Sequence, residues 1–225
     1  MIIGSLHIST ENHIYRITNF TKCCEHSFFS HMIETFPLKP KYKLPGDHLY
    51  CSDSIVSLPE FIQHNPFTIQ NATKLMYSIY YQIQVFLENN IAISFIDLHD
   101  IMVVDGTHFY FCNCDKLYAI KKNNRIVITD FYDTVNPFLP PEFRKNNIMP
   151  FSTFSTSSYY SLAIVILYCL HENDVKEPFK PVALLNDPSN IDHSIILHKY
   201  CHTKLYHTLL SCLIEEPKER NPILF

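Results

Sequence analysis

The chain has 225 residues, of which 47% are hydrophobic and 18% charged, and its 18 basic and 22 acidic residues give a formal net charge of −4. This apolar content is enough to fill one large core or two small lobes. The acidic balance gives no electrostatic reason to expect nucleic acid as a partner. With glycine only at positions 4, 46 and 106, the sequence also lacks a glycine-rich phosphate loop and a Walker loop.

The cysteines and the apolar runs indicate where the protein works. Eight cysteines follow an N-terminus that has neither the basic segment nor the long apolar stretch of a secretory signal. We therefore expect reduced thiols in an intracellular, cytoplasmic protein, with Cys112 and Cys114 as buried thiols. The longest apolar run, about a dozen residues from Tyr159 to Leu170, is shorter than the roughly 20 that span a bilayer, so we expect no membrane association.

The first 55 residues are predicted to form short strands. Leu6–Ile8 and Ile14–Ile17 are β-prone and flank a polar stretch, a pattern that favours a hairpin. Residues 24–36 are compatible with a short helix. Three prolines then favour loop or extended structure, at Pro37, Pro40 and Pro45.

A long helix over Asn71–Asn90 is the strongest prediction of local structure. Its apolar residues recur at intervals of three and four, as on a helix with one buried face, at Met76, Ile79, Tyr80, Ile83, Phe86 and Leu87. Thr68 or Asn71 can cap the start of this helix, and the Asn-Asn pair at its end favours a stop. A shorter helix, Ser57–His64, is expected before it.

Strands are predicted after the long helix. Ile101–Val104 and His108–Cys114 flank Asp105-Gly106, a strong signal for a hairpin turn. Two further strands, Leu117–Ile120 and Ile126–Thr129, are expected as a pair around a polar turn.

Helices are predicted to close the chain. Ser157–Leu170 is nearly all apolar and is expected to be a buried core helix. Thr203–Glu216 is amphipathic through Leu205, Leu209, Cys212 and Leu213. A short helix within Asp187–Lys199 is expected between them.

Several short motifs occur in the order in which protein kinases carry theirs, and the chain resembles that family over roughly residues 45–222. Each motif has a counterpart in the large lobe of a kinase: the hinge and its helix at residues 49–66, the long helix at 71–90, the catalytic loop and next strand at 95–104, an A-P-E-like Pro140-Pro141-Glu142, the start of the buried helix at Ser158–Ala163, and a late Arg220. At the buried helix, Ser158 replaces the aspartate of the family.

The resemblance implies roles for three residues of the catalytic site. Asp97 precedes Leu98 as the catalytic aspartate of the family precedes its leucine, so it is the candidate proton acceptor. Asp100 and Asn113, thirteen residues apart, take the positions of the two metal ligands, with the family's Asn and Asp exchanged. The implied cofactors are ATP and Mg²⁺, which prefers such oxygen ligands.

The resemblance also implies a structural ion pair and a fold. Glu142 corresponds to the A-P-E glutamate and Arg220 to its late arginine partner, so we expect these side chains to pair. The implied fold is α+β, a two-lobed protein kinase-like domain. Its N-terminal lobe, residues 1–55, is reduced, and its C-terminal lobe, residues 56–225, is mainly helical.

The chain departs from the kinase pattern mainly where kinases bind and transfer phosphate. Ile3-Gly4-Ser5 is at most a vestige of the glycine-rich loop, and Lys22, with Glu25 or Glu34 as its partner, does not lie in the family's lysine motif. Only three residues separate Asp97 from Asp100, where the family pattern needs five. These departures predict a catalytically impaired pseudokinase that acts through binding or allostery, with a protein as its partner.

Two alternatives remain open from the sequence. One is a divergent, active Ser/Thr-type kinase that uses Asp97, Asp100 and Asn113 with ATP and a divalent metal. The other is an unrelated structural or interaction protein. The glycine-poor composition and the small N-terminal lobe resemble the kinase-like proteins of large DNA viruses, which would place the protein in the host cytoplasm or the virion.

Overall fold

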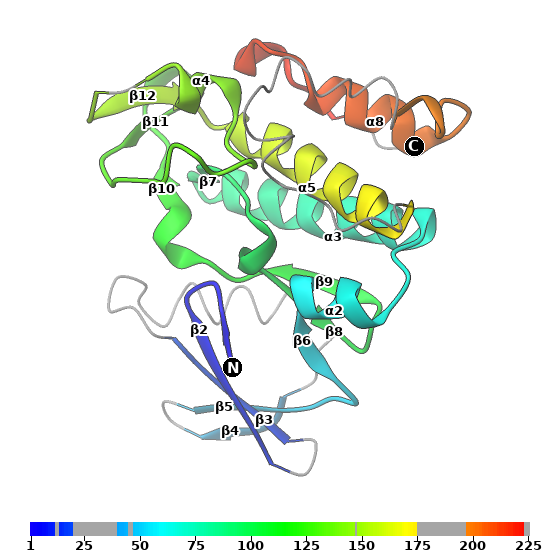
Figure 1. The fold of residues 1–225 in the computed structure, drawn as a ribbon. Coiled ribbons are helices and arrows are strands. Elements are labelled where there is room, and N and C mark those ends of the chain that lie inside the picture. Colours follow the sequence, from blue (N-terminus) through cyan, green and yellow to red (C-terminus); the bar gives the residue numbers. More distant parts are fainter. Residues whose placement is uncertain (12–13, 20–39, 45–46, 147, 175–196, 223–225) are drawn as a thin grey trace. The chain divides into compact units, whose positions relative to one another are not determined.

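The computed structural model of the chain describes residues 1–11, 14–19, 40–44, 47–146, 148–174 and 197–222 (Figure 1). It is a mixed α+β structure with small antiparallel sheets, as predicted. The expected helix at 24–36 and most of the one expected within 187–199 lie outside the described residues, as do Lys22, Glu25 and Glu34.

The chain divides into two compact units that interleave along the sequence. The first comprises Met1–Asn65 and Leu98–Leu117, and the second Pro66–Asp97 and Tyr118–Phe225. Packing therefore groups residues 98–117 with the N-terminal segment. The lobe boundary after residue 55 is implied by the resemblance to kinases, and it stays a prediction.

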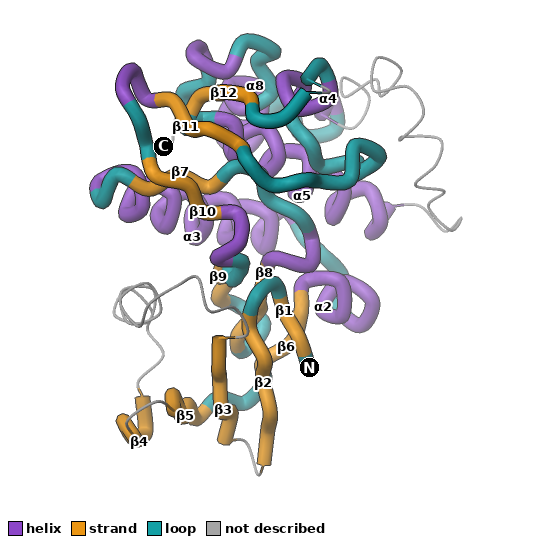
Figure 2. The backbone as a smooth tube through the Cα atoms, turned by 90° about the vertical axis from the view of Figure 1, so that its left-hand side faces the viewer, coloured by secondary structure: helices purple, strands orange, loops and turns teal. Residues whose placement is uncertain are grey.

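In its described residues, the first unit contains two antiparallel sheets and one short α-helix. A five-stranded sheet has the order β1-β2-β3-β5-β4, and a three-stranded sheet has the order β6-β8-β9 (Figure 2). The elements are β1 (Ile2–Ile3), β2 (Leu6–Glu11), β3 (Ile14–Asn19), β4 (Pro40–Leu44), β5 (Asp47–Cys51), β6 (Ile55–Ser57), α2 (Leu58–His64), β8 (Ile101–Val104) and β9 (His108–Phe111).

Both hairpins predicted for this part of the chain are confirmed. Strands β2 and β3 pair from Leu6↔Asn19 to Glu11↔Ile14, and β8 pairs with β9 around Asp105-Gly106, whose φ angles of 51° and 63° are left-handed. One core joins the two sheets through apolar side chains, among them Ile3, Leu6, Ile8, Ile17, Ile55, Met102 and Val104. Strand β9 ends three residues earlier than expected because Asn113 caps a 3₁₀ helix, η2 (Cys114–Lys116).

Within the part of the second unit that the structure describes lie the longer helices and two small two-stranded sheets. Its elements are α3 (Ile69–Glu88), β7 (Ile91–Ile93), β10 (Leu117–Ala119, which starts at the boundary between the units), β11 (Arg125–Ile128), α4 (Pro141–Arg144), β12 (Phe151–Phe154), α5 (Ser157–Asp174) and α8 (Lys204–Cys212).

The predicted long helix is present as α3, and the side chain of Thr68 caps it by accepting from the backbone N–H of Asn71. Helix α5 packs against it: the rings of Tyr80 and Tyr159 stack at 6.0 Å, and Gln84 donates to the Tyr159 hydroxyl at 2.6 Å. Among the described residues, no helix is long and apolar enough to cross a membrane.

One predicted strand pairing is wrong. The segments expected to pair around the polar turn, now β10 and β11, belong to different sheets: β10 pairs with β7, and β11 pairs with β12 from Arg125↔Phe154 to Ile128↔Phe151. The polar turn closes with a single bridge, Lys121↔Arg125. Pairing with β12 instead places Ile126 and Ile128 in an apolar cluster with Phe143 and Phe151, so burial decided the partner.

Candidate functional site

The predicted metal ligands, Asp100 and Asn113, lie together in the first unit. Asp100 immediately precedes β8, and Asn113 lies two residues after the last residue of β9. The antiparallel register of these strands pairs Ile101 with Phe111, and the N–H of Cys112 donates to the carbonyl of Asp100 at 2.7 Å. The hairpin therefore brings together two side chains that are thirteen residues apart in the sequence.

The side chains of this cluster bind one another. Asn113 Nδ2 donates to Asp100 Oδ1 at 2.7 Å, and Asn113 Oδ1 accepts from the backbone N–H of Asp115 at 3.1 Å. The ammonium of Lys116 lies 2.6 Å from Asp100 Oδ2. All three side-chain oxygens that were candidate metal ligands thus already accept a hydrogen bond.

Lys116 is the residue of this cluster that sequence reasoning missed. It lies three residues after Asn113, and the 3₁₀ helix η2 turns the backbone so that the side chain of Lys116 reaches the carboxylate of Asp100. Asp100 is only 3% exposed, so its charge needs a nearby cation. A lysine three residues after the candidate Asn was the available signal, because a buried carboxylate requires a partner of opposite charge.

In this arrangement the cluster does not fit a divalent cation. Mg²⁺ prefers several hard oxygen ligands, whereas here a lysine ammonium neutralises the one carboxylate. Elsewhere in the described ranges, no three His, Cys, Asp or Glu side chains gather in a group that could hold a metal. A metal would have to displace Lys116 from Asp100.

The tip of the β1–β2 hairpin is fixed to the backbone beside this cluster. The N–H of Gly4 donates to the carbonyl of His99 at 2.8 Å, and the N–H of Ser5 donates to that of Cys112 at 2.9 Å. The Ser5 hydroxyl donates to the same Cys112 carbonyl and accepts from the N–H of Cys114. A Cβ at Gly4, whose φ is +55°, would lie 2.5 Å from the Cys112 oxygen, so only glycine allows this close approach.

The candidate catalytic residue, Asp97, belongs to the second unit and is half-buried. Its Oδ2 accepts from Asn136 Nδ2 at 2.6 Å, and Asn136 Oδ1 in turn accepts from the N–H of Phe138 at 2.9 Å. The carboxylate is therefore tied to the loop between β11 and α4. This contact does not require Asp97 to be catalytic.

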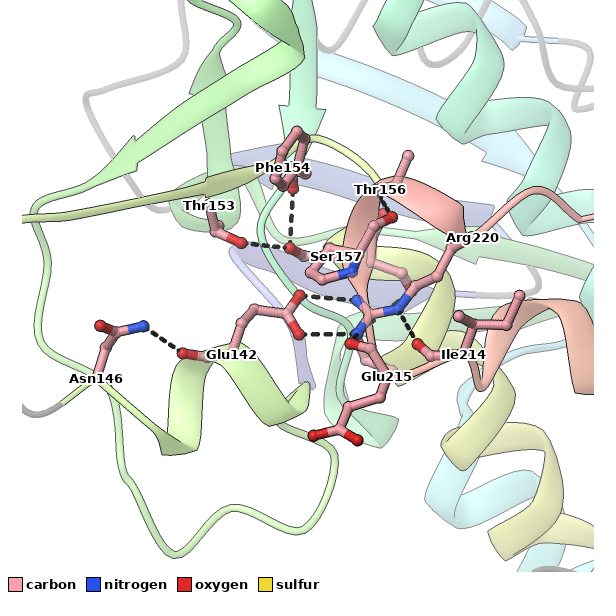
Figure 3. A network of polar contacts seen from close by, with 12 residues as sticks. Glu142, Asn146, Thr153, Phe154, Thr156, Ser157, Ile214, Glu215 and Arg220 are labelled. Carbon is pink, nitrogen blue, oxygen red and sulfur yellow. Dashed lines mark hydrogen bonds and ion pairs between the residues drawn. The ribbon is translucent and has the colours of Figure 1, made fainter.

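The expected ion pair between Glu142 and Arg220 is present in the second unit (Figure 3). Arg220 Nη1 and Nη2 donate to the two oxygens of Glu142 at 2.7 and 2.8 Å, which is bidentate geometry. The guanidinium also donates to the carbonyls of Ile214, through Nε at 2.7 Å, and Glu215, through Nη2 at 2.8 Å.

Arg220 is fully enclosed by this network. The residue is 2% exposed, and its guanidinium carbon lies 5.0 Å from the ring centre of Tyr160 on α5. Thr156 donates to the carbonyl of Pro217 at 2.6 Å and adds a second link to the C-terminal segment. The network therefore joins α4, α5 and residues 214–220.

Comparison with known proteins adds no family assignment, because no protein-family model and no curated protein matches the chain. The kinase resemblance therefore rests on the motifs of the chain itself.

Proposed function

We propose that the chain is a protein kinase-like domain that acts by binding a protein partner and does not transfer phosphate. Its reduced small lobe would be residues 1–55, and its large lobe residues 56–225. The observation that carries the proposal is the Asp100–Lys116 ion pair, in which the candidate metal-binding carboxylate is already neutralised by a lysine.

The ion pair bears directly on phosphoryl transfer. Kinases stabilise the transferring phosphoryl group mainly by positioning it and by neutralising charge with bound metal. Here a metal would have to separate Lys116 from a buried carboxylate, and breaking one side of a buried pair costs about 3–5 kcal/mol. A metal-dependent nucleotide site is therefore disfavoured in this chain.

The β1–β2 hairpin supports the same proposal. In the family this turn carries the glycine-rich loop, whose backbone N–H groups cradle phosphates. In this chain the N–H groups of Gly4 and Ser5 donate to protein carbonyls instead. Two donors that a nucleotide phosphate would need are thus already used.

The loop between β11 and β12 supports a protein partner. Phe131 is 94% exposed and Ile148 79% exposed, although both are large apolar residues. Contiguous apolar surface, rather than single exposed residues, marks protein interaction sites, and we propose that these two side chains contribute to such a surface. In the proposed fold this loop includes the counterpart of the kinase activation segment.

The experiment compares nucleotide binding by the unaltered chain and by Lys116→Met. For the unaltered chain, we expect ATP with Mg²⁺ or Mn²⁺ to give no more thermal stabilisation than ATP alone, and no phosphotransfer. Lys116→Met should lower the free energy of unfolding by about 3 kcal/mol, because it removes a cation that lies 2.6 Å from a buried carboxylate. It should also gain Mn²⁺-dependent stabilisation through Asp100 Oδ2, the oxygen that Lys116 contacts in the unaltered chain.

Two further variants keep the test interpretable. Lys122→Met also removes one positive charge, but from an exposed lysine on η3 (Lys122–Asn124). It should change neither the free energy of unfolding nor the stabilisation by Mn²⁺. If Lys116→Met does not fold, Asp100→Asn with Lys116→Met removes both charges and should fold without gaining metal binding. Metal-dependent phosphotransfer by the unaltered chain that Asp97→Asn abolishes would contradict the proposal and support the active kinase alternative.

A further inference from the structure

A pocket of about 310 Å³ lies within the first unit, and none of its lining residues belongs to the Asp100 cluster. Its lining residues belong to β6, to the adjacent helix α2 and to the turn between β8 and β9 or flank these elements. Figure 1 shows where these elements lie in the fold. The residues that define its chemistry are Val56, Glu60, Phe61, His64, Asp105 and Gly106. This volume is near the lower limit for small-ligand sites and suits one large side chain.

Two carboxylates line the pocket. Asp105 uses Oδ1 to accept from the Ser52 hydroxyl at 2.6 Å and from the N–H groups of Asp53 and Ser54 at 2.9 and 3.1 Å. In the described part of the chain, no donor contacts Asp105 Oδ2, and no hydrogen bond or ion pair engages the carboxylate of Glu60. Both groups are therefore able to accept from a ligand.

The carboxylate of Asp105 is held in its charged form. Partial burial acts to raise its pKa, but the hydrogen bonds from Ser52, Ser54 and Asp53 outweigh this and lower the pKa below its ordinary value. The turn also fixes the direction of the side chain. The negative charge at this wall is thus present at neutral pH and held in a fixed position.

An aromatic ring forms a rigid part of the wall. Phe61 is 6% exposed, and its ring packs edge-to-face against Phe109 with centroids 6.2 Å apart. At Gly106 a Cβ would meet only the ring of Phe61, at 3.6 Å, so the glycine leaves space beside the ring. A site that combines an aromatic ring with carboxylates favours the binding of a planar cation.

We propose that this pocket binds the guanidinium group of an arginine side chain presented by a protein partner. The two carboxylates match its charge and its several N–H donors, and the ring of Phe61 offers a surface for its flat face. The inference goes beyond the proposed function and does not depend on it, because no residue of the kinase-like catalytic or metal positions lines the pocket.

The test is a titration of the full chain, followed by amide NMR, with N-acetyl-arginine amide as probe and the citrulline analogue as its uncharged match. We expect saturable shifts at Phe61, Asn65 and Gly106 with the arginine probe in the millimolar range, and none with the citrulline probe.

Glu60→Gln should weaken binding of the arginine probe at least fivefold. Glutamine suits this third helix position as well as glutamate does, so α2 should remain intact. The control Glu11→Gln removes the same charge from an exposed residue of β2 outside the pocket and should leave binding unchanged. The inference would be overturned if both probes gave equal shifts, or if the amides of Phe61, Asn65 and Gly106 showed no saturable shift. Equal affinity of the Glu60→Gln and Glu11→Gln variants for the arginine probe would also overturn it. None of these outcomes alters the nucleotide and metal assays.

Discussion

Two buried ion pairs, one in each unit, use their charges in different ways. Glu142 and Arg220 are 78 residues apart, and the planar guanidinium makes four hydrogen bonds, two to Glu142 on α4 and two to the carbonyls of Ile214 and Glu215. Asp100 and Lys116 are 16 residues apart, and the lysine contacts one carboxylate oxygen within a single hairpin region. The first pair joins distant segments of the chain, whereas the second neutralises a local charge.

The difference shows why one pair was predicted and the other was missed. The Glu142–Arg220 pair follows from two motifs whose order resembles that of the kinases. Lys116 belongs to no motif, and its role depends on how deeply Asp100 is buried, which is a property of the folded chain.

Arg220→Met should have the largest effect on stability. It removes four hydrogen bonds and leaves Glu142 without its cation, so the free energy of unfolding should fall by about 3–5 kcal/mol. Denaturant titration measures this change. The matched control is Lys145→Met, because Lys145 pairs with Glu215 at an exposed site and should have no measurable effect. Similar losses in both variants would show that the enclosed network is no stronger than a surface pair.

Gly4→Ala and Gly106→Ala compare two glycines that both have positive φ angles. Each substitution forces alanine into the left-handed region, at about 1–2 kcal/mol. Only Gly4 adds a clash, since its Cβ would lie 2.5 Å from the Cys112 oxygen. We expect Gly4→Ala to destabilise the chain by about 3 kcal/mol in denaturant titration, and Gly106→Ala by only the backbone cost. Equal losses would mean that the hairpin tip is not held against the Cys112 backbone.

Asp105→Asn should give the smallest effect, and that effect should depend on pH. Because the folded-state pKa of Asp105 is lowered from 3.8, its charge stabilises the fold above about pH 4, and this contribution is lost as the pH falls through the folded-state value. Asparagine tolerates the left-handed φ and keeps an accepting oxygen. At pH 7 the variant should be about 1 kcal/mol less stable, discounted for the exposure of the site, and the difference should shrink toward pH 3. A difference that stays constant with pH would exclude the charge as its cause.

The sequence alone predicted the elements that depend on local interactions. The helix that became α3 follows from apolar periodicity and a capping residue, α5 follows from its nearly all-apolar run, and the β8–β9 hairpin follows from Asp105-Gly106. Such features depend on neighbours a few residues away, so the sequence contains most of the information. It also identified Asp100 and Asn113 as a pair joined by a hairpin, although not as partners of each other and of Lys116.

Tertiary structure decided what depends on burial and on distant partners. It paired β11 with β12 because that placed Ile126 and Ile128 in an apolar cluster, and it grouped residues 98–117 with the N-terminal sheets. It also neutralised Asp100 with Lys116 and used the N–H groups of Gly4 and Ser5 within the protein. The physical reason is the same in each case: the cost of burying a charge or an unpaired polar group depends on the folded surroundings, which no short stretch of sequence specifies.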